Sequence, residues 1–379
     1  MQFREVGKTG CKGSIIGLGC EHLDGMTYEQ TKETIDAALE GGINIMDVFM
    51  PGTTVRGNIA KALGSRREQV LIQGHIGSTD VRQQYDICRD LPVVQQYFED
   101  LLRHFGYIDF GMMFFVDSEQ DYQDVFETGF ADYVQKLKRQ GDIRHIGFGS
   151  HNPVTARKVV ETGIPEIMMF SINPAFDLLP AKTYVLDELE QLNADAFQGF
   201  DPQRAALYQL CEQKGVGITV MKTLGAGKLI SAEHTPFEKP LTVGQCIHYA
   251  LSRPAVASVL IGCKSGAEIR EALRYLELDD RERDYAPILG TLRGDFKGNC
   301  VYCSHCEPCP VQIDIASVNK YLDIARLDLQ HIPPSVRSHY SALEHGGESC
   351  IGCRSCEKRC PFGVPIVENM AEAAALFNK

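Results

Sequence analysis

The sequence predicts an α/β protein in two parts: a (β/α)8 TIM barrel followed by a small cysteine-rich C-terminal domain. Short apolar runs of the β type alternate with amphipathic helical patterns along about the first 276 residues. Eight such pairs over about 250 residues are typical of a barrel. Eight of the fourteen cysteines then fall into two short runs near the end of the chain. A chain of 379 residues has room for one large domain and one small one.

Each strand is predicted from a short β-type run, and each helix from apolar residues three or four positions apart. Thr27, with Gln30 three residues later, indicates a helix start, and Gly41-Gly42 its end. The expected strands are 15–19, 43–49, 69–74, 108–115, 143–149, 166–172, 217–221 and 255–261. The expected helices are 27–39, 55–63, 93–105, 126–139, 153–162, 203–214, 243–252 and 267–276. A doubly wound open sheet is the alternative that periodicity does not exclude.

Two connections, 174–202 and 224–242, are longer than ordinary loops between a strand and its helix. At the C-terminal rim of a barrel, such loops would form the walls of an active site. Residues 277–299 are charged and read as the connection to the second domain, so we divide the chain into 1–285 and 286–379. Inside the second domain we expect helices over 315–329, ending before Pro333-Pro334, and over 367–377.

Composition and the N-terminal residues predict a soluble, cytoplasmic protein that does not bind nucleic acid. Apolar residues make up 44% of the chain and charged residues 23%, as in ordinary globular proteins. The N-terminus, Met-Gln-Phe-Arg-Glu, carries charges where a signal peptide needs an apolar core, and no apolar stretch is long enough for a membrane span. A net charge of −12 argues against nucleic acid as a partner, because phosphate binding needs clustered Lys and Arg. The oligomeric state is left open.

The two cysteine runs have the spacing of iron–sulfur ligands. Three thiolates at two-residue spacing can wrap one face of an iron–sulfur cube, and the fourth, just before a proline, belongs to the other cube in two-cluster ferredoxins. We therefore expect two 4Fe-4S clusters in a ferredoxin-like domain. The first run is one residue shorter before its last cysteine than the bacterial ferredoxin spacing, which the second run has. One cluster is assigned to Cys300, Cys303, Cys306 and Cys360, and the other to Cys350, Cys353, Cys356 and Cys309.

Zinc sites and disulfides are the alternatives for these cysteines. Four-thiolate zinc sites use two CxxC pairs separated by a loop, whereas here four cysteines lie in one tight run followed by proline. Disulfides need an oxidising compartment, and nothing marks this chain as secreted. Both alternatives fit the spacing less well than clusters do.

Short segments spread over nearly the whole chain share the pattern of one enzyme family. They are 3–10 (FREVGKTG), 17–19 (GLG), 42–47 (GINIMD), 107–109 (YID), 145–148 (HIGF) and 262–270. The chain resembles an aldo/keto reductase, and its paired cysteine runs resemble the branch of that family with a C-terminal ferredoxin-like domain. The resemblance implies a (β/α)8 barrel that binds NADPH across its C-terminal rim. It also implies hydride transfer to a carbonyl, with a tyrosine acid assisted by lysine, aspartate and histidine.

Three of the four residues of that catalytic tetrad are replaced. Asp47 matches the family aspartate, but Gly52 stands in place of the tyrosine, His75 in place of the lysine and Phe114 in place of the histidine. Carbonyl reduction needs a proton donor for the developing alkoxide, and glycine donates nothing. Asp47 and His75 are therefore the candidate catalytic couple, since imidazole titrates near pH 6.5. A hydrogen-bonded strand-end role is the alternative for His75, and the further candidate donors are Tyr302, His22 and His151.

The resemblance also implies a nucleotide site. Lys264, Ser265 and Arg270 match the family's adenosine 2′-phosphate site, where a helix N-terminus and two cations attract phosphate. A solvated helix start is the alternative. The family has a glutamine after its sixth strand, and this chain has Met168 or Met169 in its place. We expect NADP(H), with a flavin as the alternative cofactor. Ser150 and Asn152 match the nicotinamide contacts, and Lys222, Leu224 and Gly225 the diphosphate loop.

The leading functional hypothesis is an oxidoreductase whose two clusters exchange electrons with a small-molecule site at the barrel mouth and with a redox partner protein. NADPH gives two electrons as hydride whereas each cluster carries one, so coupling them needs a flavin, a substrate radical or two half-reactions. One alternative is a non-catalytic electron carrier or adaptor with a pseudo-enzyme barrel. Another is a non-redox acid/base enzyme with structural clusters. An apolar or aromatic-friendly pocket is predicted from Phe49, Phe114, Phe115 and Phe176.

Overall fold

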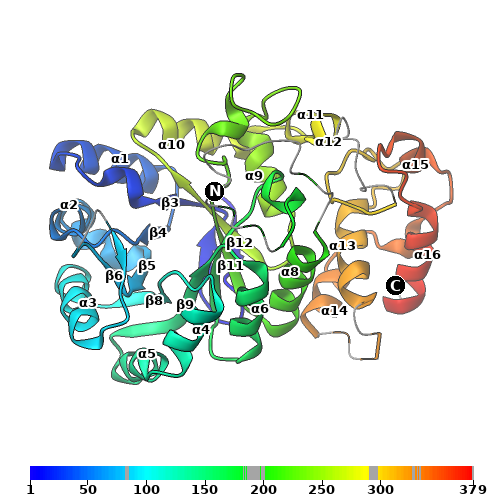
Figure 1. Ribbon diagram of the computed structural model, residues 1–379. Helices are drawn as coiled ribbons and strands as arrows, with labels where there is room; N and C mark the ends of the chain where they lie inside the picture. The colour runs from blue at the N-terminus through cyan, green and yellow to red at the C-terminus, as the bar shows by residue number, and fades with distance from the viewer. Residues whose placement is uncertain are drawn as a thin grey trace.

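Eight parallel strands close into a barrel, as the ribbon of the computed structural model shows (Figure 1). Strand β12 pairs with β3 and so completes the ring. The closed barrel confirms the predicted fold class and excludes the open, doubly wound sheet. The strands are β3 (Ile16–Gly19), β4 (Ile45–Val48), β5 (Leu71–Ile76), β8 (Ile108–Met113), β9 (Ile143–Ser150), β10 (Ile167–Ser171), β11 (Gly217–Met221) and β12 (Val256–Gly262). The structure describes residues 1–377 apart from 82–84, 182, 184, 186–196, 198–200, 290–297, 327–328, 331 and 333.

Helices cover the outside of the barrel, and those at the eight predicted positions are present. The predicted capping box is formed: the Thr27 hydroxyl accepts a hydrogen bond from the Gln30 backbone N–H, and the Gln30 side chain accepts one from the Thr27 N–H. These helices are α1 (Tyr28–Glu40), α2 (Thr53–Leu63), α3 (Leu91–Phe105), α5 (Phe130–Gln140), α6 (Pro153–Glu161), α8 (Pro202–Lys214), α9 (Val243–Leu251) and α10 (Gly266–Leu273).

Several short elements were not predicted. The expected helix over 126–139 is wrong at its start, because Gly129 adopts φ +87° and separates α5 from an additional helix, α4 (Glu119–Phe126). The connection expected at 277–299 contains two further helices, and its residues 290–297 lie outside the described part of the chain. The unpredicted elements also include β1 (Phe3–Glu5), β2 (Lys12–Ser14), β6 (Ser78–Thr79), β7 (Asp86–Ile87), α11 (Asp280–Arg283) and α12 (Ala286–Leu289).

The β1–β2 hairpin closes the N-terminal end of the barrel. Val6, in the turn between the two strands, is fully buried and packs with Ile45, Phe110 and Ile167 from the barrel interior. Because this end is filled by apolar side chains, access to the interior is left to the opposite end, where the C-terminal ends of the strands meet.

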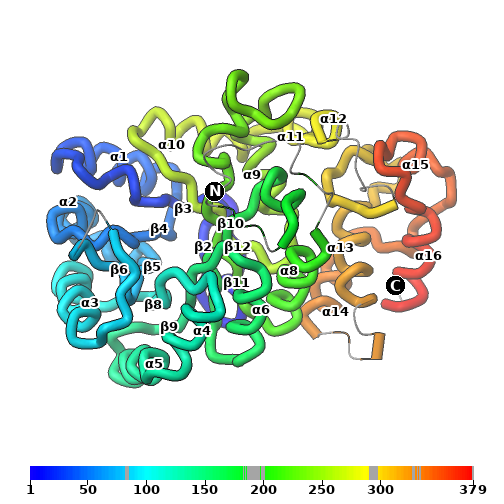
Figure 2. Tube along the Cα trace, in the orientation of Figure 1, coloured from blue at the N-terminus to red at the C-terminus, as the bar shows by residue number. Residues whose placement is uncertain are grey.

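The C-terminal part of the chain lies beside α8, in orange to red in Figures 1 and 2. The helix expected over 315–329 is described to Arg326, and residues 327–328 are outside the described part. The expected closing helix is present as α16, whereas α14 was not predicted because Pro334, interpreted as a stop, begins it. The helices here are α13 (Ile315–Arg326), α14 (Pro334–Ser341), α15 (Ser355–Arg359) and α16 (Ile366–Phe377).

A buried arginine joins this part to the barrel. Arg253, just after α9, donates hydrogen bonds to the Tyr285 hydroxyl at 3.0 Å and to the Val301 carbonyl. The Tyr285 hydroxyl donates to the same carbonyl at 2.9 Å. Since Val301 lies between Cys300 and Cys303, the first cysteine run is fixed directly to the barrel core.

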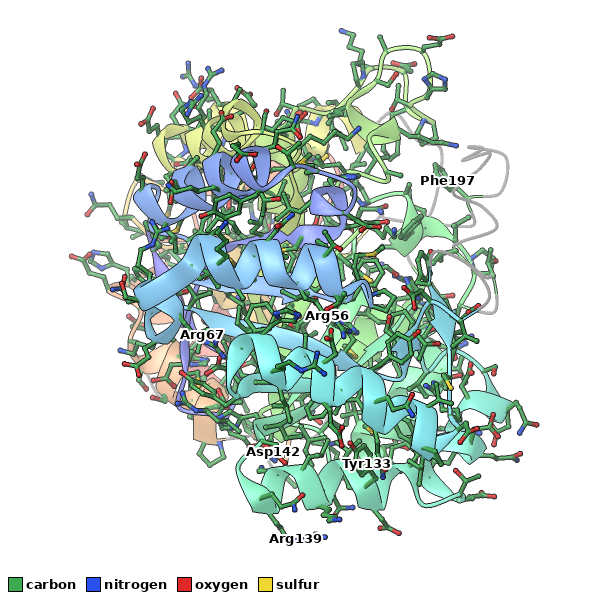
Figure 3. The ribbon with its side chains drawn as sticks, turned by 90° about the vertical axis from the view of Figure 1, so that its left-hand side faces the viewer. Arg56, Arg67, Tyr133, Arg139, Asp142 and Phe197 are labelled. Carbon is green, nitrogen blue, oxygen red and sulfur yellow. The ribbon has the colours of Figure 1, made fainter. Side chains whose placement is uncertain are left out.

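Arginines also tie the outer helices together on the face shown in Figure 3. Arg56 on α2 is buried and donates to the Met50 carbonyl at 3.0 Å, to the Tyr97 carbonyl at 2.8 Å and to Asp100 of α3 at 3.2 Å. These bonds fix the chain that leaves β4 against α3. The loop after β4, which carries the cavity residue Phe49, is therefore fixed on its outer side.

Glu166 links β9 to the loop before β10 and provides a test of the barrel's electrostatics. It accepts hydrogen bonds from His145 at 3.0 Å, from the Ile146 N–H at 3.3 Å and from Lys138. Burial opposes its ionisation, but these donors together lower its pKa to about 2. A lowered carboxyl pKa stabilises the fold above the unfolded-state value of about 4.3, and this stability is lost as pH falls toward the folded value.

We expect Glu166→Gln to lower the free energy of unfolding at pH 7 by about 1 kcal/mol, because the site is partly solvated. The difference from wild type should shrink between pH 4.5 and pH 2, as read from urea midpoints. The control is Glu161→Gln, whose side chain is 47% exposed beside Arg157. An equal loss of unfolding free energy in Glu166→Gln at pH 7 and at pH 3 would contradict a lowered pKa for Glu166.

Candidate active site and cysteine pockets

A cavity of about 600 Å³ opens at the C-terminal end of the barrel. This volume suits a small organic ligand or cofactor. Strand ends form part of its lining, and the loops that follow the strands form the rest. Residues that contribute to the lining include Asp47, Phe49, His75, Tyr85, Phe114, Phe115, His151, Met169, Lys222, Leu224, Lys264 and Glu268.

Asp47 and His75 meet inside this cavity. His75 Nε2 lies 2.8 Å from Asp47 Oδ1, which also accepts a hydrogen bond from Gln73 Nε2 at 2.7 Å. Gln73 Oε1 in turn accepts from the Thr219 hydroxyl at 2.9 Å, so a chain of buried polar groups crosses the barrel. The adjacent pairing of β4 with β5 produces this arrangement, since Asp47 is the register partner of Gln73. The structure thus brings the two predicted residues together, and their catalytic role stays a prediction.

The second ring nitrogen of His75 is buried and has no partner among the described residues. The imidazole is 4% exposed, and its Nδ1 has no hydrogen-bond partner among the described residues. A buried polar atom left unpaired costs about 1–3 kcal/mol, so such an atom is a site for a ligand group. Imidazole at this position can donate or accept a proton.

Aromatic rings lie beside His75, and three of the four phenylalanines predicted to line the pocket do so. The Phe114 ring lies 5.4 Å from the imidazole, and Phe49 lies 6.1 Å from it. Phe115 also lines the cavity, but Phe176 does not: it is fully buried and packs against Leu179. The cavity therefore has aromatic surface next to the His75 imidazole, which suits flat or apolar groups.

Tyr85 is a cavity residue that the sequence reasoning missed. Its ring lies 5.5 Å from Phe49, and burial raises the pKa of its hydroxyl. Gly52, which the resemblance puts at the family tyrosine position, is the N-cap residue of α2 and is not among the described lining residues of the cavity. The only signal for Tyr85 was its place in the segment after the third strand, where no element was predicted.

The predicted nucleotide residues divide into two groups. Lys222, Leu224 and Lys264 line the cavity, whereas Ser150, Asn152, Gly225, Ser265 and Arg270 are not among its described lining residues. Several of the second group already have partners within the protein. The Ser150 hydroxyl bonds to Asp117, Asn152 caps α6, and Ser265 caps α10. The cofactor role of all eight residues stays a prediction.

Glu268 is a second residue that the sequence reasoning missed. Its carboxylate accepts a hydrogen bond from the Lys264 backbone N–H at 2.7 Å and lines the cavity beside Lys264. A carboxylate thus meets one of the N–H groups that the resemblance assigned to a phosphate. The spacing of Ser265 and Glu268, three residues apart at a helix start, is the signal that could have found it.

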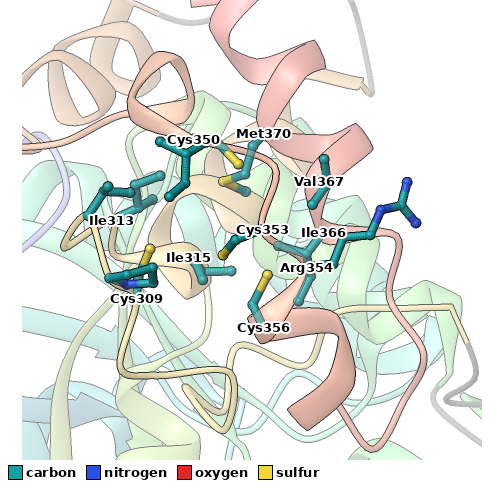
Figure 4. Close-up of a pocket in the computed structure, with 13 residues that line it drawn as sticks. Cys309, Ile313, Ile315, Cys350, Cys353, Arg354, Cys356, Ile366, Val367 and Met370 are labelled. Carbon is teal, nitrogen blue, oxygen red and sulfur yellow. The ribbon is translucent and has the colours of Figure 1, made fainter.

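The eight cysteines of the two runs gather around two separate pockets. One pocket is lined by Cys309, Cys350, Cys353 and Cys356, with Ile315, Ile366 and Met370 among its apolar neighbours (Figure 4). The other is lined by Cys300, Cys303, Cys306 and Cys360. These are the two sets of four assigned from the sequence, and each takes one cysteine from the other run. Their role as cluster ligands stays a prediction.

The backbone between these cysteines turns through the left-handed region. Tyr302 and Ser304 have φ of 57° and 61°, and Gly352 and Arg354 have φ of 67° and 56°. One left-handed residue therefore lies in each of the spacings Cys300–Cys303, Cys303–Cys306, Cys350–Cys353 and Cys353–Cys356, but none lies between Cys306 and Cys309. Such turns form concave nests of N–H groups that bind anions, iron–sulfur centres included. The donor set and the turns fit a cluster held by four thiolates.

Two negative findings apply to the described part of the chain. No three His, Cys, Asp or Glu side chains in the described ranges are placed to hold one metal ion. No helix among the described residues is long and apolar enough to cross a membrane.

The family model for the aldo/keto reductase family matches residues 15–243, more than half of the chain. The chain belongs to the aldo/keto reductase family. It is 25% identical over 289 residues to the uncharacterized oxidoreductase YqkF of Bacillus subtilis (strain 168), covering 72% of this chain and 90% of that protein. The family and this relative identify the protein as an oxidoreductase enzyme.

Solved structures of aldo-keto reductases share the fold. The holo form of AKR11C1 from Bacillus halodurans has a TM-score of 0.57 and 19% identity, covering 75% of this chain and 94% of that chain. Its apo form has a TM-score of 0.50 at the same identity and coverage. The family match ends before Cys300, so the cysteine runs lie outside the matched part of this aldo/keto reductase.

Gln73 allows the buried polar chain of this aldo/keto reductase to be tested. We expect Gln73→Leu to lower the free energy of unfolding by about 1–3 kcal/mol, because Asp47 and Thr219 each lose a buried partner. Urea unfolding measures the change. Gln120→Leu, at an exposed pair with Asp124 on α4, is the control and should change stability by less than about 0.5 kcal/mol. Equal effects of the two substitutions would argue against the buried chain.

Proposed function

We propose that this aldo/keto reductase is an iron–sulfur oxidoreductase that acts on a small carbonyl compound at the barrel mouth and exchanges electrons through two 4Fe-4S clusters. The observation that carries the proposal is the sorting of eight cysteines into two pockets of four, each completed by a cysteine of the other run. This crossed arrangement is the one used by two-cluster ferredoxins. On this proposal the barrel unit spans 1–285 and the ferredoxin-like unit 286–379.

The proposed clusters would be held by thiolates close to the barrel. The pocket of Cys300 and Cys303 lies next to the barrel core, because Val301 between them accepts bonds from Arg253 and Tyr285. The other pocket is nearer to solvent, since Cys353 is exposed. Bound clusters would carry one electron each. The exposed pocket is the natural side for a redox partner protein, in a cytoplasm that keeps thiols reduced.

We place NADP(H) in the barrel cavity, with its phosphates toward Lys222 and Lys264 and its nicotinamide toward His75. Family membership supports this cofactor, and the cavity joins all three residues in one space. A flavin phosphate at the same loop ends is the alternative. His75, held by Asp47, would hydrogen-bond the substrate through Nδ1 and hold a proton there.

Iron content tests the cluster proposal. Protein purified without oxygen should be brown and contain about eight iron and eight sulfide per chain. Cys360→Ser and Cys309→Ser should each remove part of the iron, and electron paramagnetic resonance of the reduced variants should show loss of different clusters. Cys88→Ser, at a cysteine outside both pockets, is the control. Colourless, iron-free wild-type protein would exclude the proposal.

Fluorescence titration tests the nucleotide proposal. We expect NADPH to bind, and Lys264→Met to weaken its binding about tenfold, since one charge-assisted phosphate contact is worth about 1.5 kcal/mol. Lys61→Met, at a lysine over the Tyr28 ring on the outer helices, is the matched control and should bind as wild type does. Unchanged binding by Lys264→Met would place the phosphate elsewhere.

A further inference from the structure

We propose that His151, held by Asp117, is a second acid–base couple of the cavity, and that with His75 it suits a planar conjugated dicarbonyl of the quinone type. Such a substrate takes up two electrons and two protons, one proton at each oxygen. The proposal rests on the proposed function, because it needs a carbonyl substrate at the barrel mouth.

Asp117 holds His151 by two contacts and is itself bound by Ser150. His151 Nδ1 lies 2.9 Å from Asp117 Oδ2, and the His151 backbone N–H donates to Oδ1 at 2.6 Å. The Ser150 hydroxyl donates to Oδ1 at 3.0 Å. Both side chains of the couple are buried, with 7% and 4% of their surface exposed. Since Nδ1 is bound to the carboxylate, Nε2 is the nitrogen left for the cavity, which His151 lines.

The charge of Asp117 suits this role. Burial opposes its ionisation, but the charge and hydrogen bonds of His151 and the hydrogen bond of Ser150 outweigh burial and lower its pKa. An ionised, buried carboxylate on one imidazole nitrogen fixes the tautomer and stabilises the protonated ring. This is the arrangement of an imidazole that exchanges protons at its other nitrogen.

The fold fixes the couple from both sides. Asp117 follows β8 and His151 follows β9, and the Thr155 hydroxyl of α6 donates to the Asp117 carbonyl at 3.0 Å. Phe115, whose ring lies 5.1 Å from His151, is held at φ +57°. A non-glycine residue in the left-handed region costs of order 1–3 kcal/mol, and such strain gathers at functional sites.

The two couples face one space. Gly149 lies between them and also lines the cavity, and a Cβ on it would lie 3.9 Å from His75 Cε1 and 4.0 Å from the Phe115 nitrogen. With no side chain there, the space beside His75 continues along β9 toward His151. The rings of Phe114 and Phe115 flank this space. In the proposal, a flat ring in this space has one oxygen on the side of the His75 imidazole and the other on the side of His151, and the buried His75 Nδ1 gains a partner when the substrate binds.

The proposed step balances. The quinone gains two electrons, either as a hydride from reduced nicotinamide or singly from two reduced clusters. Both C=O π bonds are converted to C–OH bonds. With single electrons, one proton comes from each protonated imidazole; with hydride, one of the two hydrogens comes from the cofactor and one from an imidazole. The neutral imidazoles then take protons from water. The electron donor is oxidised by two electrons in total.

Single-turnover kinetics test the proposal on the full-length protein. Anaerobic protein reduced with titanium citrate and desalted would be mixed with tetramethyl-1,4-benzoquinone, a quinone that does not readily alkylate thiols. Cluster reoxidation is followed by absorbance. We expect His151→Gln to slow the reaction about a hundredfold or more, as loss of a general acid does, with quinone affinity changed less than about threefold. Asp117→Asn should slow it in the same way, because the tautomer is no longer fixed.

The matched control is His145→Gln. His145 lies on the same strand, β9, and also contacts a carboxylate, Glu166, but it is not among the cavity residues. A single-carbonyl probe, 4-nitrobenzaldehyde with NADPH, should lose less activity in His151→Gln than the quinone does, because it needs only one proton. A rate in His151→Gln equal to that of His145→Gln overturns the proposal. An equal loss for both probes overturns the dicarbonyl substrate.

A measurement without clusters separates this proposal from the proposed function. Iron-free protein, or a wild type that never takes up electrons, would count against the proposed function alone. In that case ¹⁵N spectra of labelled histidines test the second couple on its own. Adding tetramethyl-1,4-benzoquinone should shift the signals of His151 Nε2 and His75 Nδ1 and leave those of His145 unchanged. Unmoved signals of His151 would overturn the second couple.

Discussion

Closure of eight parallel strands is the constraint on which the chemistry of this protein depends. Strand β12 pairs with β3, and Gly262 is the register partner of Gly19, so the C-terminal ends of all eight strands share one rim. The opposite end is filled by Val6 and its apolar neighbours. Polar side chains at the strand ends therefore point into one shared cavity, where residues far apart in the sequence meet. Asp47, His75 and His151 line one cavity for this reason.

The cysteine region depends on the barrel through a few buried polar contacts. Arg253, Tyr285 and the carbonyl of Val301 form one such contact, with both side chains almost fully buried. Removing a partner from a buried charge costs several kcal/mol, so this contact favours one relative position of the two parts. A fixed position matters for electron exchange, which needs a constant separation between donor and acceptor. The junction thus gives the proposed clusters a defined place beside the barrel.

The sequence predicted the strands and helices that are marked by local patterns of apolar and capping residues. Apolar β-type runs marked the eight strands, and Thr27 with Gln30 marked a capping box that is present. Boundaries that depend on single backbone angles were missed: Gly129 at φ +87° divides one expected helix into two. Cysteine spacing anticipated which four thiols share each pocket, because the crossed arrangement is encoded in the run length and the following proline.

The sequence predicted site residues that lie on neighbouring strands. It did not predict contacts between residues that lie in loops. Asp47 and His75 lie on adjacent strands, so the pairing of β4 with β5 brings them together. Asp117 and His151 come from loops after β8 and β9, and only the folded chain shows that a carboxylate holds that histidine. Glu268 was missed for a related reason, because its carboxylate folds back onto the Lys264 N–H.

The replaced tetrad and the aromatic lining favour the same kind of chemistry. The predicted replacements leave no tyrosine and lysine to stabilise a charged alkoxide, and in the structure Asp47 contacts Gln73 and His75 instead. A cavity lined by aromatic rings penalises any intermediate that carries an unpaired charge. Electrons that enter singly avoid such a charge only if a proton arrives with each of them. In the mechanism proposed above, two imidazoles, each bonded to a buried carboxylate, supply these protons, so that neither a tyrosine nor a lysine is needed.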